Sequence, residues 1–136
     1  MSDYKKRRKR GMDVLKKMGR ENLMLEQKEL FPELYEMSVG HLFGDVWARS
    51  GLSLRERQLV TLAANIALAR PSGNYSHFRS AKHIGISQRE ISEVILQVGH
   101  YAGWPTLAHA VRQYTEVLNE EADRKKGRKK RKPLLV

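Results

Sequence analysis

The sequence predicts an all-α fold, a single-domain helical bundle of about six helices. Apolar residues recur at three- and four-residue intervals in several segments, which is the period of one helix face. Proline, glycine and short polar turns separate these segments, and no run alternates strictly between apolar and polar residues as a half-buried strand would. With 136 residues, 40% of them hydrophobic, the chain suits one domain and is too short for two ordinary ones.

The first third of the chain predicts a basic extension followed by helices. Residues 1–11 hold six successive cations that repel one another, so we expect this segment to be disordered or frayed. A weak helical pattern over residues 12–30, interrupted at Gly19, predicts one or two lead-in helices. Pro32 suits the first turn of a stronger helix, which we expect to end between Trp47 and Arg49.

The middle of the chain predicts a long helix and a shorter one. Ser53 can cap the long helix at its N-terminus. Residues 71–74 (Pro-Ser-Gly-Asn) combine turn formers and predict a break. The shorter helix is expected over about residues 74–83, and Gly85 is expected to end it in a left-handed conformation.

The last two predicted helices have clear start and stop signals. Ser87 and Glu90 form a capping-box pattern at the start of the first of them. Gly103 predicts its end, and Pro105 suits the first turn of the final helix. These signals complete the count of about six helices.

Charge divides the chain into three parts. Residues 1–20 carry a net charge of +7 and residues 124–136 carry +8, whereas residues 21–123 carry −4. We therefore expect a basic N-terminal extension, a helical domain over residues 21–123 and a basic disordered tail. The high overall charge does not predict a nucleic-acid-binding core, because the excess of basic residues lies at the ends.

Composition excludes several kinds of site. The chain has no cysteine, which excludes disulfides, thiolate metal sites and thiol-based redox chemistry. The five histidines show no metal-binding spacing, so we expect no metal site. No apolar run suits a signal peptide or a membrane span, which predicts a cytoplasmic protein that does not bind membranes.

Six short motifs follow one another in the predicted helical domain. They are Phe43–Arg49, Gly51-Leu52 with Arg57, His77–Ala81 with Gly85, Glu90–Val94, Tyr101–Pro105 and His109-Ala110. In order and spacing this series resembles the 4-carboxymuconolactone decarboxylases, of the carboxymuconolactone decarboxylase family. The resemblance covers a little over half of the chain and implies the helical fold of the alkyl hydroperoxidase D-like superfamily.

The chain differs from one branch of that superfamily. The peroxidases of this branch carry a Cys-x-x-Cys motif before the family histidine, and the corresponding positions here are Arg70 and Gly73. Thiol peroxidase chemistry needs a thiolate, so this activity is excluded. Ser50 and the loop at residues 71–75 also differ from the decarboxylase pattern, which bears on the substrate more than on the fold.

The resemblance implies a cofactor-independent carboxy-lyase that acts on a small unsaturated lactone acid in the catabolism of aromatic compounds. In the family's reference reaction, the electrons left behind by CO2 delocalise through the ring onto the lactone carbonyl. The substrate therefore supplies its own electron sink, and neither a metal nor an organic cofactor is needed. The resemblance also implies a homo-oligomer, either a hexamer or a trimer of dimers.

The resemblance also implies roles for individual side chains. The family histidine falls on His77, the expected general acid, because an imidazole titrates near neutral pH; the alternative is a helix histidine satisfied by a carbonyl. Glu56 is a second catalytic candidate, although a first-turn glutamate also suits the helix dipole. Arg57 is the expected clamp for a substrate carboxylate. Further substrate-binding candidates are Arg49, Trp47, Tyr101, Trp104 and His109.

Two alternatives to a decarboxylase remain open. The first is an enzyme of the same fold that catalyses another proton-transfer reaction, such as an isomerisation or a dehydration. The second is a non-enzymatic protein that binds a polyanion through its basic ends, without sequence readout because these ends lack interleaved aromatic residues. The basic ends could also serve solubility alone.

Overall fold

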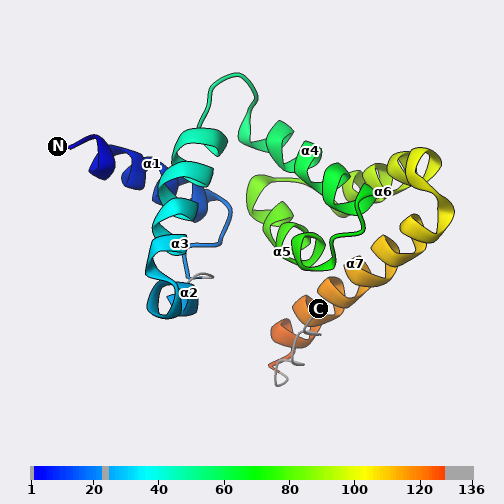
Figure 1. The fold of residues 1–136 in the computed structure, drawn as a ribbon. Helices are drawn as coiled ribbons and strands as arrows, with labels where there is room; N and C mark the ends of the chain where they lie inside the picture. The colour runs from blue at the N-terminus through cyan, green and yellow to red at the C-terminus, as the bar shows by residue number, and fades with distance from the viewer. Residues whose placement is uncertain (1, 23–24, 128–136) are drawn as a thin grey trace. The chain divides into compact units, whose positions relative to one another are not determined.

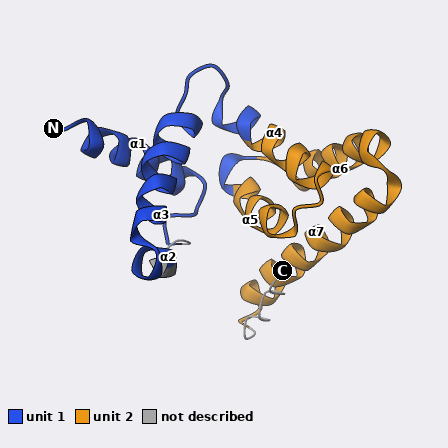
Figure 2. Ribbon diagram, viewed as in Figure 1, with its two compact units in different colours: residues 1–57, 83–85 blue, residues 58–82, 86–136 orange. Residues whose placement is uncertain are grey.

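The structure, a computed structural model, describes residues 2–22 and 25–127 (Figure 1). Over these residues it has seven α-helices, one π-helix, one short 3₁₀ helix and no strand, which confirms the predicted all-α fold. The chain divides into two compact units (Figure 2). Unit 1 comprises residues 1–57 and 83–85, and unit 2 comprises residues 58–82 and 86–136. The predicted domain limits at residues 21 and 123 are not tested by this division.

Unit 1 is built around the packing of α1 (Asp3–Lys17) against the π-helix η1 (Ser38–Trp47), with α2 (Leu25–Leu30) and α3 (Pro32–Met37) between them in the chain. An apolar cluster is formed by residues of α1, α3 and η1 and by Met18, which follows α1. Its buried members are Val14, Leu15, Met18, Tyr35, Val39, Phe43 and Trp47.

The helical state of residues 3–11 differs from the prediction of a disordered or frayed segment. Ser2 caps α1 at its N-terminus, and Gly19, which has a φ of 67°, follows the helix as a left-handed residue. The prediction is wrong because it weighed the repulsion between cations alone. In the structure Arg7 and Arg10 pair with Asp45, and Arg8 pairs with Glu36.

The predicted helix from Pro32 to about Arg49 forms as two consecutive elements. Pro32 begins α3, as predicted, but the chain widens into the π-helix η1 from Ser38 to Trp47. The apolar pattern could not separate these states. Val39, Phe43 and Trp47 recur every fourth residue and are buried, which is a spacing that suits a helix of either kind.

Unit 2 contains most of α4 (Leu54–Ala67), together with α5 (Pro71–Ala81), α6 (Gln88–Ala102) and α7 (Trp104–Lys125). The helices α4 and α5 run antiparallel, because Gln58 in the first half of α4 contacts His77 in the second half of α5, whereas Asn65 near the end of α4 lies against Gly73 near the start of α5. The helices α5 and α7 run parallel, and α7 also packs on α6.

The ends of the helices in this part of the chain follow the predicted signals, with one exception. Ser87 and Glu90 form the capping box at the start of α6, and Gly85 and Gly103 adopt positive φ values of 81° and 111°. The predicted break at residues 71–74 is wrong, because Pro71 occupies the first turn of α5 and the helix continues from there. Residues 82–84 form the short 3₁₀ helix η2 (Lys82–Ile84).

The predictions of a basic tail and of no membrane span can be compared with the described residues. The predicted basic tail begins at residue 124, but α7 continues to Lys125, and residues 128–136 lie outside the described residues. Among the residues that are described, no helix combines the length and the apolar character needed to cross a membrane.

Candidate active site

The candidate site in unit 2 centres on His77, a buried residue of α5. The helix begins at Pro71, whose fixed φ suits its first turn, and it buries Tyr75, Phe78 and Ala81 as its apolar contribution to the unit. His77 lies on this helix with only 9% of its surface exposed. The ring is therefore held inside the unit rather than in bulk water.

The side chain of Gln58, from α4, contacts His77 at two points. Its Nε2 donates a hydrogen bond of 2.7 Å to the backbone carbonyl of His77, and its Oε1 lies 2.9 Å from Nδ1 of the ring. Gln58 is fully buried, with 0% of its surface exposed. Because a buried amide needs its hydrogen bonds satisfied, the two contacts restrict the orientation of both side chains.

A second buried amide lies one helical turn before His77. Asn74 is 2% exposed, and its Nδ2 donates a hydrogen bond of 2.8 Å to Oε1 of Gln113 on α7. Its Oδ1 is buried and accepts no hydrogen bond from the described residues. A buried carbonyl oxygen without a donor is rare, and it offers an acceptor for a water molecule or a bound ligand.

Other polar residues of α5 attach this helix to α7. Tyr75 donates a short hydrogen bond to Glu116, and Arg79 forms a two-pronged ion pair with Glu120, with both N···O distances at 3.0 Å. Burial and the hydrogen bond to Glu116 raise the pKa of Tyr75 to about 12. These contacts fix the rotation of the helix that carries His77.

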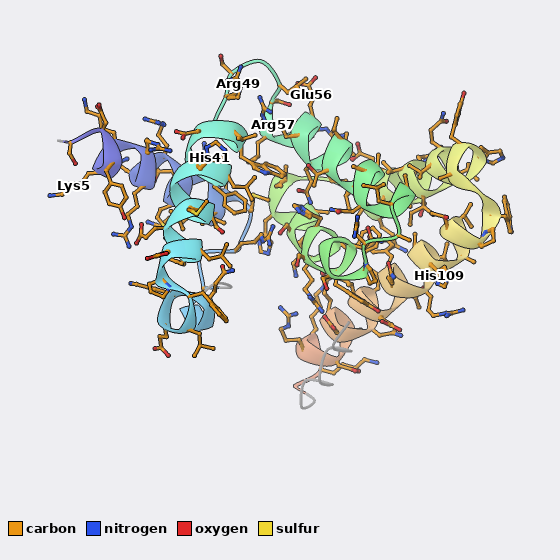
Figure 3. The ribbon with its side chains drawn as sticks, viewed as in Figure 1. Lys5, His41, Arg49, Glu56, Arg57 and His109 are labelled. Carbon is orange, nitrogen blue, oxygen red and sulfur yellow. The ribbon has the colours of Figure 1, made fainter. Side chains whose placement is uncertain are left out.

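The predicted residues Arg49, Glu56 and Arg57 lie in unit 1, around the turn that leads into α4 (Figure 3). Arg57 is half-buried, and its Nη2 donates a hydrogen bond of 3.2 Å to the backbone carbonyl of the exposed Arg49. Trp47 is buried in the core of unit 1, where its ring packs at a centroid distance of 6.1 Å from that of Phe43.

Glu56 has a structural role in the capping box of α4. Its backbone N–H donates to Oγ of Ser53, and its carboxylate accepts a hydrogen bond of 2.9 Å from the backbone N–H of Ser53. This backbone hydrogen bond, followed by the bond to the Ser53 hydroxyl, lowers the pKa of Glu56. The exposed carboxylate is therefore charged at neutral pH, a state that does not suit a general acid.

The three predicted substrate-binding residues of α6 and α7 lie on the surface of unit 2. Tyr101 is 87% exposed and Trp104 is 64% exposed. His109 is also exposed, and its ring points outward from α7 (Figure 3). Within the described chain these side chains do not enclose a pocket, and their role in binding stays a prediction.

Sequence reasoning missed Gln58 and Asn74. Gln58 was one of several polar residues in the first turn of a helix, and Asn74 stood in a segment predicted as a turn. The spacing of the buried residues of α4 could have identified Gln58 as a buried side chain. Gln58, Leu62 and Ile66 are spaced four residues apart on α4, so the glutamine belongs to the buried face of that helix.

Comparison with known proteins identifies the family of this chain. The model of the carboxymuconolactone decarboxylase family matches residues 32–116, which is more than half of the chain. This range includes His77, Gln58 and every site residue predicted from the sequence. The chain belongs to the carboxymuconolactone decarboxylase family.

Two named decarboxylases are among the relatives of this chain. A 4-carboxymuconolactone decarboxylase of Acinetobacter baylyi is 31% identical over 118 residues, covering 84% of this chain and 88% of that protein. A nitrosuccinic acid decarboxylase of Metarhizium robertsii is 31% identical over 71% of this chain and 66% of its own length. An uncharacterised 15.0 kDa protein of Paracoccus denitrificans is also 31% identical, over 72% of this chain and 75% of its own.

Membership of the carboxymuconolactone decarboxylase family, together with the names of two relatives, supports a decarboxylase-type function. The family match begins at residue 32, so α1 and α2 lie outside it. Among the described residues, no group of three or more histidines and carboxylates is arranged to hold a metal ion.

Proposed function

We propose that this protein is a cofactor-independent carboxy-lyase that decarboxylates a small unsaturated lactone acid, with His77 as the residue that moves the proton. The observation that carries the proposal is the burial of His77 in a chain of a decarboxylase family. The imidazole of His77 is removed from bulk water and held by a neutral amide, and histidine is the side chain that most often serves as a general acid or base.

The proposed reaction needs no group beyond the substrate and the protein. The bond between the ring carbon and the departing carboxylate breaks, and CO2 leaves without the bonding electron pair. That pair delocalises through the ring double bond onto the lactone oxygen. A proton from the imidazolium of His77 then reaches carbon and restores the neutral lactone, so one proton is consumed for each CO2 released.

Substrate anchoring is assigned to cationic side chains. We propose that Arg57 and Arg49 bind the substrate carboxylates, since a guanidinium meets a carboxylate through two parallel hydrogen bonds. Desolvation of the departing carboxylate in an apolar pocket would favour loss of CO2. The aromatic residues Trp47, Tyr101 and Trp104, with His109, are proposed to contact the substrate.

The test is a screen for CO2 release over small carboxylated butenolides, with the full-length chain and variants of His77. We expect His77→Ala and His77→Asn to lose at least about 100-fold in kcat/KM, the range typical of a missing proton donor. Asn keeps an N–H near the position of Nδ1 but cannot titrate. The matched control is His100→Asn on α6, an exposed histidine for which we expect no loss.

Three outcomes of this screen would be informative. CO2 release that depends on His77 supports the proposal. A reaction that depends on His77 but releases no CO2 would replace it with an isomerase or a dehydratase of the same fold. Full activity in both His77 variants would remove this residue from the chemistry.

A second candidate function, binding of a polyanion, is favoured by the arrangement of cations on α1. The arginines of this helix face acidic residues of unit 1, as in the pairs of Arg7 and Arg10 with Asp45. Its lysines are instead exposed. They are Lys5, Lys6, Lys9, Lys16 and Lys17, of which Lys9 pairs with Asp13 at 3.0 Å. A lysine-rich helix surface suits phosphate groups without sequence readout.

Fluorescence anisotropy with a random 20-base-pair duplex, over a salt titration, would test this candidate. We expect the variant Lys5→Gln/Lys16→Gln to bind more weakly and with a smaller salt dependence than the wild type. The control variant Arg89→Gln/Arg112→Gln removes the same charge from exposed positions of unit 2. Equal losses in both variants would contradict a specific role of α1.

A further inference from the structure

We infer that Gln58 is a positioning residue: it holds the His77 ring in the tautomer with its proton on Nδ1, and thereby makes Nε2 the nitrogen that exchanges a proton with the substrate. The exchange itself rests on the proposed function of His77. The tautomer does not, because it follows from two hydrogen bonds within unit 2.

The first step is the orientation of the Gln58 amide. One end of the amide lies 2.7 Å from the backbone carbonyl oxygen of His77. A carbonyl oxygen can only accept a hydrogen bond, so the group facing it must be the NH2 of the amide. The reverse orientation would place two acceptor oxygens against each other, in a position where Gln58 has no exposure to water that could relieve the repulsion.

The second step is the proton on the ring. With the NH2 directed at the backbone carbonyl, Oε1 of Gln58 faces Nδ1 of His77 at 2.9 Å. Oε1 is an acceptor only, so Nδ1 must donate and must carry a proton. A neutral imidazole has one N–H, and Nε2 therefore holds the lone pair in that state. The backbone carbonyl of His77 thus sets the tautomer of its own ring through the glutamine.

The third step concerns the protonated ring. When Nε2 takes up a proton, both nitrogens become donors, and the bond from Nδ1 to Oε1 of Gln58 is kept unchanged. The ring can therefore gain and lose a proton at Nε2 while its hydrogen bond to Gln58 is kept. A carboxylate at position 58 would instead favour the imidazolium by its charge and hold the proton more strongly.

The burial of Gln58 and His77 favours one arrangement of the hydrogen bonds between them. Gln58 is 0% exposed and His77 is 9% exposed, so water is not available to replace a lost partner of the amide. Protonation at Nε2 alone would leave Oε1 of Gln58 against the lone pair of Nδ1, with no donor between them. Gln58 also anchors the start of α4 to α5, which ties the ring to two helices rather than one.

The experiment is a proton–nitrogen NMR correlation of the imidazole rings in the full-length protein labelled with 15N-histidine. The His77 signals are identified by their loss in His77→Asn. Above the titration of the ring, we expect the pattern of an Nδ1–H tautomer for His77. A dominant Nε2–H pattern in the wild type would overturn the inference, whatever the protein catalyses.

Variants of Gln58 separate positioning from a simple packing role. Gln58→Leu keeps the approximate volume but removes the acceptor, so we expect a mixture of tautomers and a fall in kcat of at least about tenfold with little change in KM. Gln58→Glu retains an acceptor and adds a charge, so we expect the Nδ1–H pattern to persist and the pKa of His77 to rise. Gln97→Leu, at an exposed position of α6, is the matched control.

The outcomes separate the tautomer assignment of His77 from the proposed decarboxylase function. A packing role for Gln58 predicts that the tautomer of His77 stays the same in Gln58→Leu, and that result would overturn the inference. An Nδ1–H pattern that depends on Gln58, in a protein that releases CO2 from none of the butenolides, would leave the tautomer assignment standing and refute the proposed function alone. If Gln58→Leu fails to fold, the wild-type spectrum and Gln58→Glu still decide.

Discussion

Two buried residues of α5, Tyr75 and His77, have surroundings of different charge. His77 faces the neutral amide of Gln58, whereas Tyr75 donates its hydroxyl proton to the carboxylate of Glu116. Burial and the carboxylate of Glu116 both oppose the loss of a proton from the phenol of Tyr75, whereas the amide beside His77 carries no charge. Tyr75 thus serves the attachment of α5 to α7, whereas the hydrogen bond of the His77 ring to Gln58 involves no charged partner.

The raised pKa of Tyr75 predicts a loss of stability at alkaline pH. The phenol titrates near 10 in the unfolded chain and at about 12 in the folded protein, so the folded state holds the proton more tightly. The stabilisation is fully present below pH 10 and is lost as the pH rises toward 12. Urea unfolding at a series of pH values should show this decline in the wild type.

The control for this alkaline effect is Tyr75→Phe, which removes the titrating group. We expect the difference in unfolding free energy between wild type and variant to shrink as the pH rises through this window. The other ionisable side chains are the same in both proteins. A difference that stays constant with pH would show that the pKa of Tyr75 is not raised in the folded protein.

A substitution at Glu56 would separate capping from catalysis. Glu56→Gln keeps an oxygen that can accept the backbone hydrogen bond from Ser53, while it removes the charge. We expect CO2 release within about twofold of wild type, because the contacts of this side chain are those of a helix cap. A loss of tenfold or more in kcat, in a variant that melts like the wild type, would restore Glu56 as a catalytic residue.

Among the helices, α1 shows how a strongly charged segment can fold. Its apolar residues Val14, Leu15 and Met18 belong to the core of unit 1. Close packing on η1 depends on two glycines. A Cβ at Gly11 would overlap the backbone carbonyl of Val39, and a Cβ at Gly44 would overlap that of a residue in α1. The backbones of the two helices can therefore approach more closely than side chains would allow.

This contact predicts that Gly11→Ala destabilises the protein. The added methyl group meets backbone atoms rather than a flexible side chain, so the helices must separate, and we expect a loss of about 2–3 kcal/mol. Gly40→Ala is the control, because a Cβ at Gly40 meets no atom within 4 Å. Chemical denaturation should leave Gly40→Ala close to wild type. Equal stability of Gly11→Ala and Gly40→Ala would mean that α1 does not pack on η1 in solution.

For the whole molecule, we expect self-association, as the resemblance to the family implies. Large apolar side chains of unit 2 are exposed, among them Tyr101, Trp104, Leu96 and Val111. Covering such residues in an assembly would remove apolar area from water. Light scattering coupled to size exclusion should give a multiple of the 15.7 kDa chain mass, with a hexamer as the expected state.

A pair of variants tests which surface carries the association. We expect Trp104→Glu to shift the protein toward smaller species, because a charge on the start of α7 would be buried at an unfavourable cost. Leu68→Glu, at an equally exposed apolar position that follows α4, should leave the mass unchanged. A wild-type protein that is monomeric at all concentrations would contradict the expected oligomer.

The sequence by itself determined the helical class, most helix ends and the family. These features depend on local chemistry: Pro32 at a first turn, the Ser87–Glu90 capping box, and glycines such as Gly85 and Gly103 at positive φ. The family was likewise readable, because motif order and spacing are properties of the chain, and the same motifs predict that His77 is the family histidine. The helical state of residues 3–11 was not, since its arginines pair with acids more than twenty-five residues away.

Only the tertiary structure decided what surrounds His77. Gln58 precedes it by 19 residues and lies on another helix, so their contact depends on how α4 and α5 rotate and slide against each other. That register is set by the packing of buried side chains, such as Leu62 and Phe78, which no local pattern encodes. The same reason applies to Tyr101 and Trp104: periodicity marks aromatic residues as apolar, but only the packed chain shows that they lie on the surface of unit 2.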